Sequence, residues 1–282
     1  MKSGFKVWRG RSFELALDKP RVMGILNVTP DSFFDGGRYL DLDRAVARAE
    51  ELLSSGADII DVGGESTRPG SDPVPAEEQI RRTAPVVREI KRRWHDAVVS
   101  IDTTSSAVAR AAIDEGAAII NDISGFTFDP EMPKLAGECG CGCVVMHIKG
   151  TPKDMQKDPR YDDLWGEIKE YLARGAKRLL DAGVSGESIV VDPGIGFGKR
   201  LEHNLQILRE LSQLDELGFP ILVGPSRKSF IGMLLDLPLE ERLEGTIAAC
   251  VVSVLNGASI VRVHDVREVR RALDVAWAII DG

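Results

Sequence analysis

The sequence is short of several residue types and patterns, and their absence narrows the possible functions. Only four of the 282 residues are cysteine and four are histidine, so we expect no disulfide framework, and no H-x-x-x-H pattern indicates a transition-metal site. No run of about 20 consecutive apolar residues occurs, which predicts no membrane span. The N-terminal 20 residues carry charges throughout and lack an apolar segment of signal-peptide length, so we expect a cytoplasmic protein.

An excess of positive charge is also missing. The chain has 36 Lys and Arg against 44 Asp and Glu, a net charge of −8. That sign argues against nucleic acid or an anionic membrane as the main partner. A hydrophobic content of 43% with 28% charged residues is ordinary for a soluble globular protein.

Three of the four cysteines stand in one run, CGCGC, at residues 139–143. Structural zinc sites use C-x₂₋₄-C pairs with a second pair further along the chain, and that spacing is absent here. We therefore interpret the run as small residues that open the strand CVVMH.

Short apolar runs rich in Val and Ile alternate with longer amphipathic stretches along the whole chain. This pattern is typical of parallel strands buried on both faces and joined by helices. The runs predict strands at 22–27, 58–63, 97–102, 118–122, 143–147, 188–192, 220–224 and 259–263. The stretches predict helices at 42–57, 105–117, 164–183 and 201–218, which end at Gly56, Gly116, Gly183 and Gly218.

About eight such units in this length favour an α/β fold of the closed (β/α)8 TIM-barrel type, with a doubly wound open sheet as the alternative. We expect residues 1–282 to form a single domain. The first 20 residues contain two short apolar segments around a Gly-Arg turn, and we predict that they form a hairpin that closes the barrel floor.

Polar residues follow or end nearly every predicted strand, which is where a barrel carries its chemistry. Asp102, Asn121 and Asp192 offer acceptors that suit a flat heterocycle with an amino-amide edge, such as a guanine-like or pterin-like ring. Cationic donors that suit a phosphate are Arg68, Arg227, Lys228, Arg262 and His264. Phe33 and Phe197 stand on Gly-rich loops, where they could stack on a ring.

Several of these segments together match one enzyme family in order and spacing, over almost the full length. They are GILNVTPDSFFDGG, DVGGESTRPG, SIDT, NDISG, MHIKGTPKDMQ, DPGIGFGK, GPSRKSFIG and RVHDV. The chain resembles the bacterial dihydropteroate synthases, which are targets of sulfonamides. The resemblance implies a transferase that condenses 6-hydroxymethyl-7,8-dihydropterin diphosphate with p-aminobenzoate, releases pyrophosphate, uses Mg²⁺ and forms a homodimer.

The resemblance also implies a role for each matching residue. The pterin would be bound by Asp102, Asn121, Met146, Asp192 and Lys228. Asn27 would ligate Mg²⁺, and the diphosphate would be held by Asn27, Arg68, Arg262 and His264. The p-aminobenzoate site would be bordered by Thr67, Arg68, Pro69, Phe197, Ser229 and Phe33. Catalysis would depend on Lys228, Arg262, Asp102 and Asp192.

Two other functions remain possible from the sequence. A corrinoid-dependent pterin methyltransferase shares the barrel and the acidic pterin ligands, but it has no use for a diphosphate site. A non-catalytic paralogue would bind the pterin without turnover. The SRK motif at 226–228 and the RVH motif at 262–264 favour the synthase.

Overall fold

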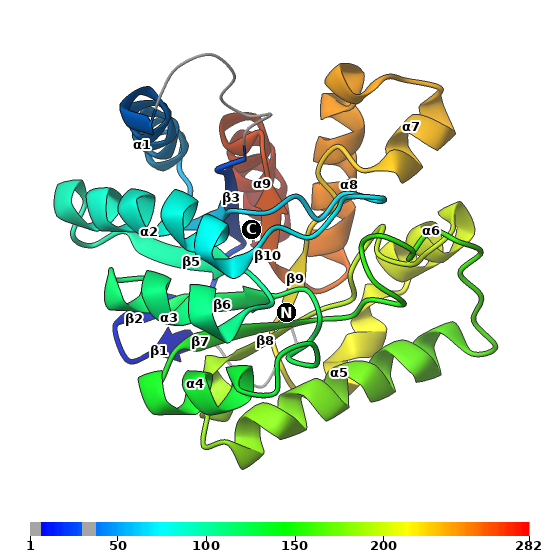
Figure 1. Cartoon of the computed structure of the whole chain (residues 1–282). Helices are drawn as coiled ribbons and strands as arrows, with labels where there is room; N and C mark the ends of the chain where they lie inside the picture. Colours follow the sequence, from blue (N-terminus) through cyan, green and yellow to red (C-terminus); the bar gives the residue numbers. More distant parts are fainter. Residues whose placement is uncertain (1–6, 30–37, 282) are drawn as a thin grey trace.

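A computed structural model describes residues 7–29 and 38–281. Within them, eight parallel strands close into a barrel in the order β10-β3-β4-β5-β6-β7-β8-β9 (Figure 1). The strands are β3 (Arg21–Asn27), β4 (Ile59–Gly63), β5 (Val98–Asp102), β6 (Ile119–Asp122), β7 (Gly142–Met146), β8 (Ile189–Asp192), β9 (Ile221–Val223) and β10 (Ala258–Val263). Each begins and ends within one residue of its predicted bounds. The closed barrel is confirmed and the open sheet is wrong.

Helices follow the strands and cover the outside of the barrel (Figure 1). They are α1 (Arg38–Ser54), α2 (Ala76–Arg93), α3 (Ser106–Asp114), α4 (Met132–Cys139), α5 (Leu164–Asp181), α6 (Leu201–Arg209), α7 (Ser229–Leu235), α8 (Leu243–Leu255) and α9 (Val266–Asp281). Short 3-10 turns are η2 (Gly186–Ser188), η3 (Leu211–Leu217) and η4 (Leu239–Glu241). No helix in the described ranges has both the length and the apolar character needed to cross a membrane.

The single helix predicted at 201–218 is wrong in one respect. It breaks at Glu210 into α6 and the 3-10 turn η3. The side-chain amide of Asn256 donates to the carbonyl oxygens of Leu208 at 2.8 Å and Arg209 at 3.2 Å. An α-helical continuation would use those two carbonyls internally, so the amide ends the helix from a distant part of the chain.

The N-terminal strands β1 (Val7–Gly10) and β2 (Phe13–Ala16) form an antiparallel hairpin. Its buried side chains Trp8 and Phe13 pack with Leu17 against inward residues of the barrel strands. The Trp8 indole N–H donates to the Ser188 carbonyl at 2.9 Å. A Cβ on Gly142 would lie 2.6 Å from the Phe13 ring, so the CGCGC run needs its small residue here to let β7 begin beside the hairpin.

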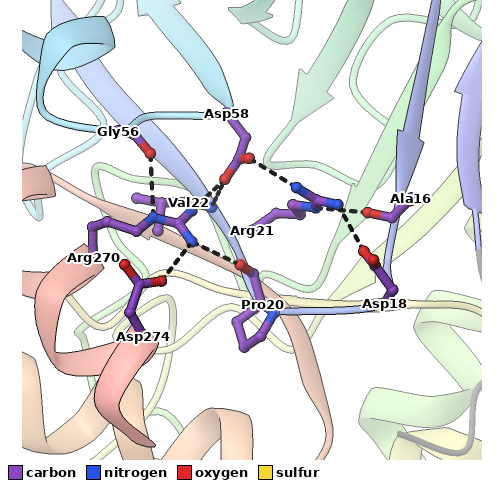
Figure 2. A network of polar contacts seen from close by, with 9 residues as sticks. All are labelled: Ala16, Asp18, Pro20, Arg21, Val22, Gly56, Asp58, Arg270 and Asp274. Atoms are coloured by element: carbon purple, nitrogen blue, oxygen red, sulfur yellow. Dashed lines mark hydrogen bonds and ion pairs between the residues drawn. The ribbon is translucent and has the colours of Figure 1, made fainter. Parts of the chain in front are cut away.

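A network of ion pairs joins helix α9 to the start of β3 and the loop before β4 (Figure 2). Asp58 lies between two arginines: Arg21 on β3, at 3.2 Å, and Arg270 on α9. Arg270 also donates to the carbonyl oxygens of Gly56 at 3.3 Å and Pro20 at 3.2 Å. One helix therefore fastens the start of β3 and the loop before β4.

Candidate active site

Four inward-facing residues form one row across the carboxyl ends of neighbouring strands. Asn27 on β3 pairs in register with Gly63 on β4, Gly63 with Asp102 on β5, and Asp102 with Asn121 on β6. A Cβ on Gly63 would lie 3.6 Å from the Asp102 Cβ and 3.7 Å from the Asn27 Oδ1. The missing side chain therefore leaves space between the amide of Asn27 and the carboxylate of Asp102.

Arg262 from β10 reaches into this row and pairs with two carboxylates. Its Nε lies 2.6 Å from the Oδ2 of Asp61, and its Nη2 lies 2.6 Å from the Oδ2 of Asp102. The Asn121 Nδ2 donates to the same Asp61 oxygen at 3.0 Å. Asp61 is 0% exposed, so a carboxylate inside the barrel joins two of the predicted site residues.

The pKa values of Asp102 and Arg262 are both shifted. Burial raises the pKa of Asp102 to about 7, although the nearby Arg262 guanidinium acts in the opposite direction. The pKa of Arg262 is raised despite its burial, because Asp61 and Asp102 stabilise its charge. Asp61 Oδ1 and Asp102 Oδ1 are buried and have no hydrogen-bond partner among the described residues. Acceptors in that state favour a ligand with N–H donors.

Asp192 at the end of β8 is fixed by the Gly-rich loop that follows it. Its Oδ1 accepts from the Gly194 N–H at 2.7 Å, and burial raises the pKa of its carboxyl. Gly194 has φ +70°, and a Cβ there would lie 1.9 Å from the His147 carbonyl oxygen. Gly196 has φ +81°, and its Cβ would meet the Lys228 stem at 2.9 Å. The loop therefore needs glycine to pass between these neighbours.

Lys228, at the start of α7, points back to this loop. Its Nζ donates to the Ile195 carbonyl and lies 4.1 Å from the ring centre of Phe197. Burial lowers the pKa of Lys228 to about 7, although the Asp192 charge raises it. Phe197 also packs with Met146 and Ile123 in a small apolar cluster, so one ring links the cation to the apolar wall.

Two of the predicted cationic donors, His264 and Arg227, are not free cations in the structure. Burial, with help from Arg262, lowers the pKa of His264 to about 4, so the imidazole is neutral at pH 7. The Ser226 hydroxyl lies 3.0 Å from the His264 Nδ1 and accepts from its backbone N–H. Arg227 is held by both oxygens of Asp265, at 2.8 and 2.7 Å. His264 can donate a neutral hydrogen bond, and Arg227 is already paired.

The buried amine of Lys199 supports the Gly-rich loop. The Lys199 Nζ lies 2.9 Å from the His147 Nδ1 and donates to the Phe197 carbonyl at 3.0 Å. Burial lowers the pKa of both Lys199 and His147 well below their usual values. His147 therefore contacts the loop that carries Phe197.

The loop between β4 and α2 borders a cavity of about 280 Å³ beside the row. Thr67 and Asp102 both line it, together with Ile123 and Phe128. The loop is tied to the segment after β7, since the Gly70 N–H donates to the Pro152 carbonyl at 2.9 Å. The side chains of Arg68 and Pro69 are exposed, and neither lines this cavity.

The remaining predicted site residues take different positions. Ser229 is exposed at the first turn of α7. Phe33 lies outside the described residues. Asp61 was not predicted, although its sequence context carried a signal: it is a carboxylate within the apolar run IIDVG, on the same strand face as Gly63.

Comparisons with known proteins show which family the chain belongs to. The family model described as pterin binding enzyme matches residues 23–264. A dihydropteroate synthase of Synechocystis sp. is 47% identical over 92% of this chain and 89% of its own length. The chain belongs to the dihydropteroate synthase family.

Solved structures of the family have the same fold. The Yersinia pestis dihydropteroate synthase with a sulfonamide drug complex has a TM-score of 0.92 and 42% identity, over 98% of this chain and 100% of that one. The Burkholderia cenocepacia dihydropteroate synthase complexed with 7,8-dihydropteroate has a TM-score of 0.87 and 40% identity, over 98% of this chain and 96% of that one. Enzymes of this family are transferases, and the predicted membership is confirmed.

Proposed function

We propose that this protein condenses 6-hydroxymethyl-7,8-dihydropterin diphosphate with p-aminobenzoate, giving 7,8-dihydropteroate and pyrophosphate. The observation that carries the proposal is the buried Asp102 Oδ1, an acceptor without a partner among the described residues, together with the guanidinium of Arg262 beside it. The first group suits the N–H donors of a pterin, and the second suits an anionic leaving group. Family membership supports the same reaction.

Recognition of the pterin would use the inward acceptors of three strands. Asp102, Asn121 and Asp192 accept hydrogen bonds from the amino group and ring N–H groups, and Met146 contacts the ring. Lys228 reaches the ring from the other side. Carboxylates that accept from the ring N–H groups also stabilise positive charge on the ring when the leaving group departs.

The reaction would begin with breakage of the C–O bond to the diphosphate. Its electron pair leaves with pyrophosphate, and the positive charge on carbon is shared with the dihydropterin ring. Arg262 and Arg68 stabilise the growing negative charge, and His264 donates a neutral hydrogen bond to it. The arylamine nitrogen then attacks the carbon, and its proton passes to the pyrophosphate that has left. The amine is already nucleophilic at pH 7, so no strong base is needed.

The residues present fit a magnesium ion at Asn27. Mg²⁺ prefers oxygen ligands, and it is often held by substrate phosphates and water with only one or two protein ligands. The half-buried amide of Asn27 faces the space left by Gly63. Among the described residues, no cluster of three or more His, Cys, Asp or Glu could hold a metal, so the amide with the diphosphate is the proposed site. When bound, the ion would neutralise charge on the departing pyrophosphate.

The p-aminobenzoate would bind nearer the surface, between Phe197 and the loop after β4. Thr67, Arg68, Pro69 and Ser229 would border it, with Phe33 on the first loop. The carboxylate of the substrate would meet Arg68, whose side chain has no hydrogen bond or ion pair within the described part of the chain. Its amine would point toward the pterin carbon.

We also propose that the protein acts as a cytoplasmic homodimer of single-domain subunits. The support is a set of large apolar side chains exposed on α7, α8 and α9. They include Met233, Leu234, Leu255, Val275 and Ile279, which are 57–77% exposed in the monomer. Sedimentation of the wild type and of Met233→Glu would test this, and a wild-type monomer would contradict it.

Pyrophosphate release tests the reaction. The purified protein is given Mg²⁺, the pterin diphosphate and p-aminobenzoate, and each component is left out in turn. We expect release only when both substrates and Mg²⁺ are present. Lys228→Ala and Asp102→Ala should lower it by more than about 100-fold, whereas Lys177→Ala, a control on the exposed face of α5, should not. Tight pterin binding without release would favour the methyltransferase or the non-catalytic paralogue.

A further inference from the structure

Asp61 occupies an unusual place for a carboxylate. It lies within β4 rather than at its end, and it pairs in register with Ile25 and Ser100. Its partner Arg262 comes from β10, and its partner Asn121 comes from β6. In the barrel order each of those strands is separated from β4 by one other strand. The side chain of Asp61 therefore links two site residues across the inside of the barrel.

The contact with Asp61 determines how the amide of Asn121 is turned. The Asp61 Oδ2 accepts from the Arg262 Nε, so the atom of Asn121 that faces this oxygen must be the donor Nδ2. The Oδ1 atom is then directed away from Asp61. Were the amide rotated, two acceptors would face each other at 3.0 Å, which is unfavourable for buried groups.

The same carboxylate also fixes the guanidinium of Arg262. Its Nε is used by Asp61 and its Nη2 by Asp102, so contacts from two strands hold the plane. Within the described residues Nη1 makes no hydrogen bond. The Nη1 group of Arg262, held in this orientation, remains available to donate to an anion.

We propose that Asp61 is a positioning residue that sets pterin specificity: it turns the Asn121 amide so that Oδ1 joins Asp102 and Asp192 in a set of acceptors. This inference rests on the proposed function. Such a set selects a ring edge that carries donors, and it disfavours an analogue whose 2-amino group is replaced by a carbonyl oxygen. Asp61 does this through Oδ2, the atom that also accepts from Arg262.

Two single variants and their combination test the proposal. Asp61→Asn lets the Asn121 amide face either way, and Asn121→Asp places two carboxylates together. Each should weaken binding of 6-hydroxymethylpterin by at least about tenfold, measured by calorimetry. In the combined variant the new amide at position 61 can donate to the carboxylate at position 121, but the atom that donates then no longer accepts from the Arg262 Nε. A carboxylate at position 121 presents an acceptor whichever way it is turned, so binding should recover in part relative to the single variants.

Ligand discrimination separates this role from a merely structural one. The wild type should prefer 6-hydroxymethylpterin over the corresponding 2-oxo compound by at least about tenfold. Asp61→Asn should reduce that ratio, and the combined variant should restore it in part. Ser100→Ala is the control: its hydroxyl is buried on the next strand without a hydrogen-bond partner in the described chain, and the ratio should stay unchanged.

Each alternative outcome is distinct. A combined variant that regains thermal stability but binds the pterin no better than the worse single variant would overturn the inference. Equal binding of the amino and 2-oxo compounds by the wild type would also overturn it, even if Asp61→Asn fails to fold. A wild type that binds the pterin with the expected preference but releases no pyrophosphate would refute the proposed reaction alone.

Discussion

The amine of Lys228 lies 4.1 Å from the ring centre of Phe197. The two residues come from different loops, after β9 and β8, and the Ile195 carbonyl accepts from the same amine. A cation at this distance from an aromatic face is stabilised by the ring. The pair connects the predicted pterin and p-aminobenzoate sites, so a change in one residue should affect the use of both substrates.

The buried amine of Lys228 should make stability depend on pH in a defined way. Its pKa is about 7 in the folded protein and 10.5 in the reference state. Between these values the unfolded chain binds the extra proton, so this group makes the folded state more stable as the pH rises. Lys228→Met lacks that contribution. We expect it to be more stable than the wild type by at least about 1 kcal/mol at pH 6, with a smaller difference at pH 10.

Urea unfolding at several pH values measures this difference. Lys177→Met, on the exposed face of α5, is the matched control and should leave the stability curve unchanged. A constant gap between Lys228→Met and the wild type from pH 6 to 10 would contradict the assignment.

Removing the cation between two buried carboxylates should be costly. Arg262→Met leaves Asp61 and Asp102 without their partner, and we expect a loss of about 3 kcal/mol in the free energy of unfolding at pH 7. Adding Asp61→Asn to that variant should recover part of the loss, because one buried charge is then gone. Denaturant unfolding of the four proteins gives the coupling energy, and a value near zero would show that the contacts do not act together.

The Gly-rich loop should tolerate no side chain at Gly194. Its φ is +70°, and a Cβ would lie 1.9 Å from the His147 carbonyl oxygen, so Gly194→Ala should lose at least about 3 kcal/mol. Gly183 has a similar φ of +89° with nothing within 4 Å of the position of its Cβ. Gly183→Ala should therefore lose only about 1–2 kcal/mol. Thermal unfolding compares the two variants. Equal losses would mean that the backbone conformation alone determines the loss of stability.

The ion-pair network around Asp58 should affect stability and not turnover. Arg270→Ala removes one of two arginines from Asp58 and leaves the carbonyls of Gly56 and Pro20 without this donor (Figure 2). We expect a loss of about 2 kcal/mol, with an unchanged KM for both substrates. Arg267→Ala, an exposed arginine one turn earlier on α9, should stay within about 0.5 kcal/mol of the wild type. A raised KM in Arg270→Ala would show that this network influences the site.

The strands and their polar ends could be predicted because both follow local rules. Buried parallel strands give short runs of Val and Ile, and alternation identifies which residue of each run faces inward. Asn27, Asp102, Asn121 and Asp192 could be found in this way. The helix break at Glu210 could not, because the group that causes it, Asn256, lies far away in the sequence.

The contacts between site residues could not be predicted, for a related reason. The contact of Asp61 with Arg262 depends on β4 and β10 both pairing with β3, which no local pattern reports. The neutral state of His264 depends on burial and on the charge of Arg262 nearby. The residue type and position of His264 can be read from the sequence, whereas its charge is a property of the folded surroundings.

The hydrogen bond from Trp8 to Ser188 has a consequence for synthesis of the chain. The two residues are 180 positions apart, and β3 pairs with β10, the last strand made. When the ribosome has produced the hairpin, neither the carbonyl for its indole nor the final neighbour of β3 exists yet. The apolar face of Trp8 and Phe13 must therefore stay uncovered through most of translation, which exposes the nascent chain to aggregation. We expect this protein to depend on a chaperone during synthesis more than a fold built from local contacts.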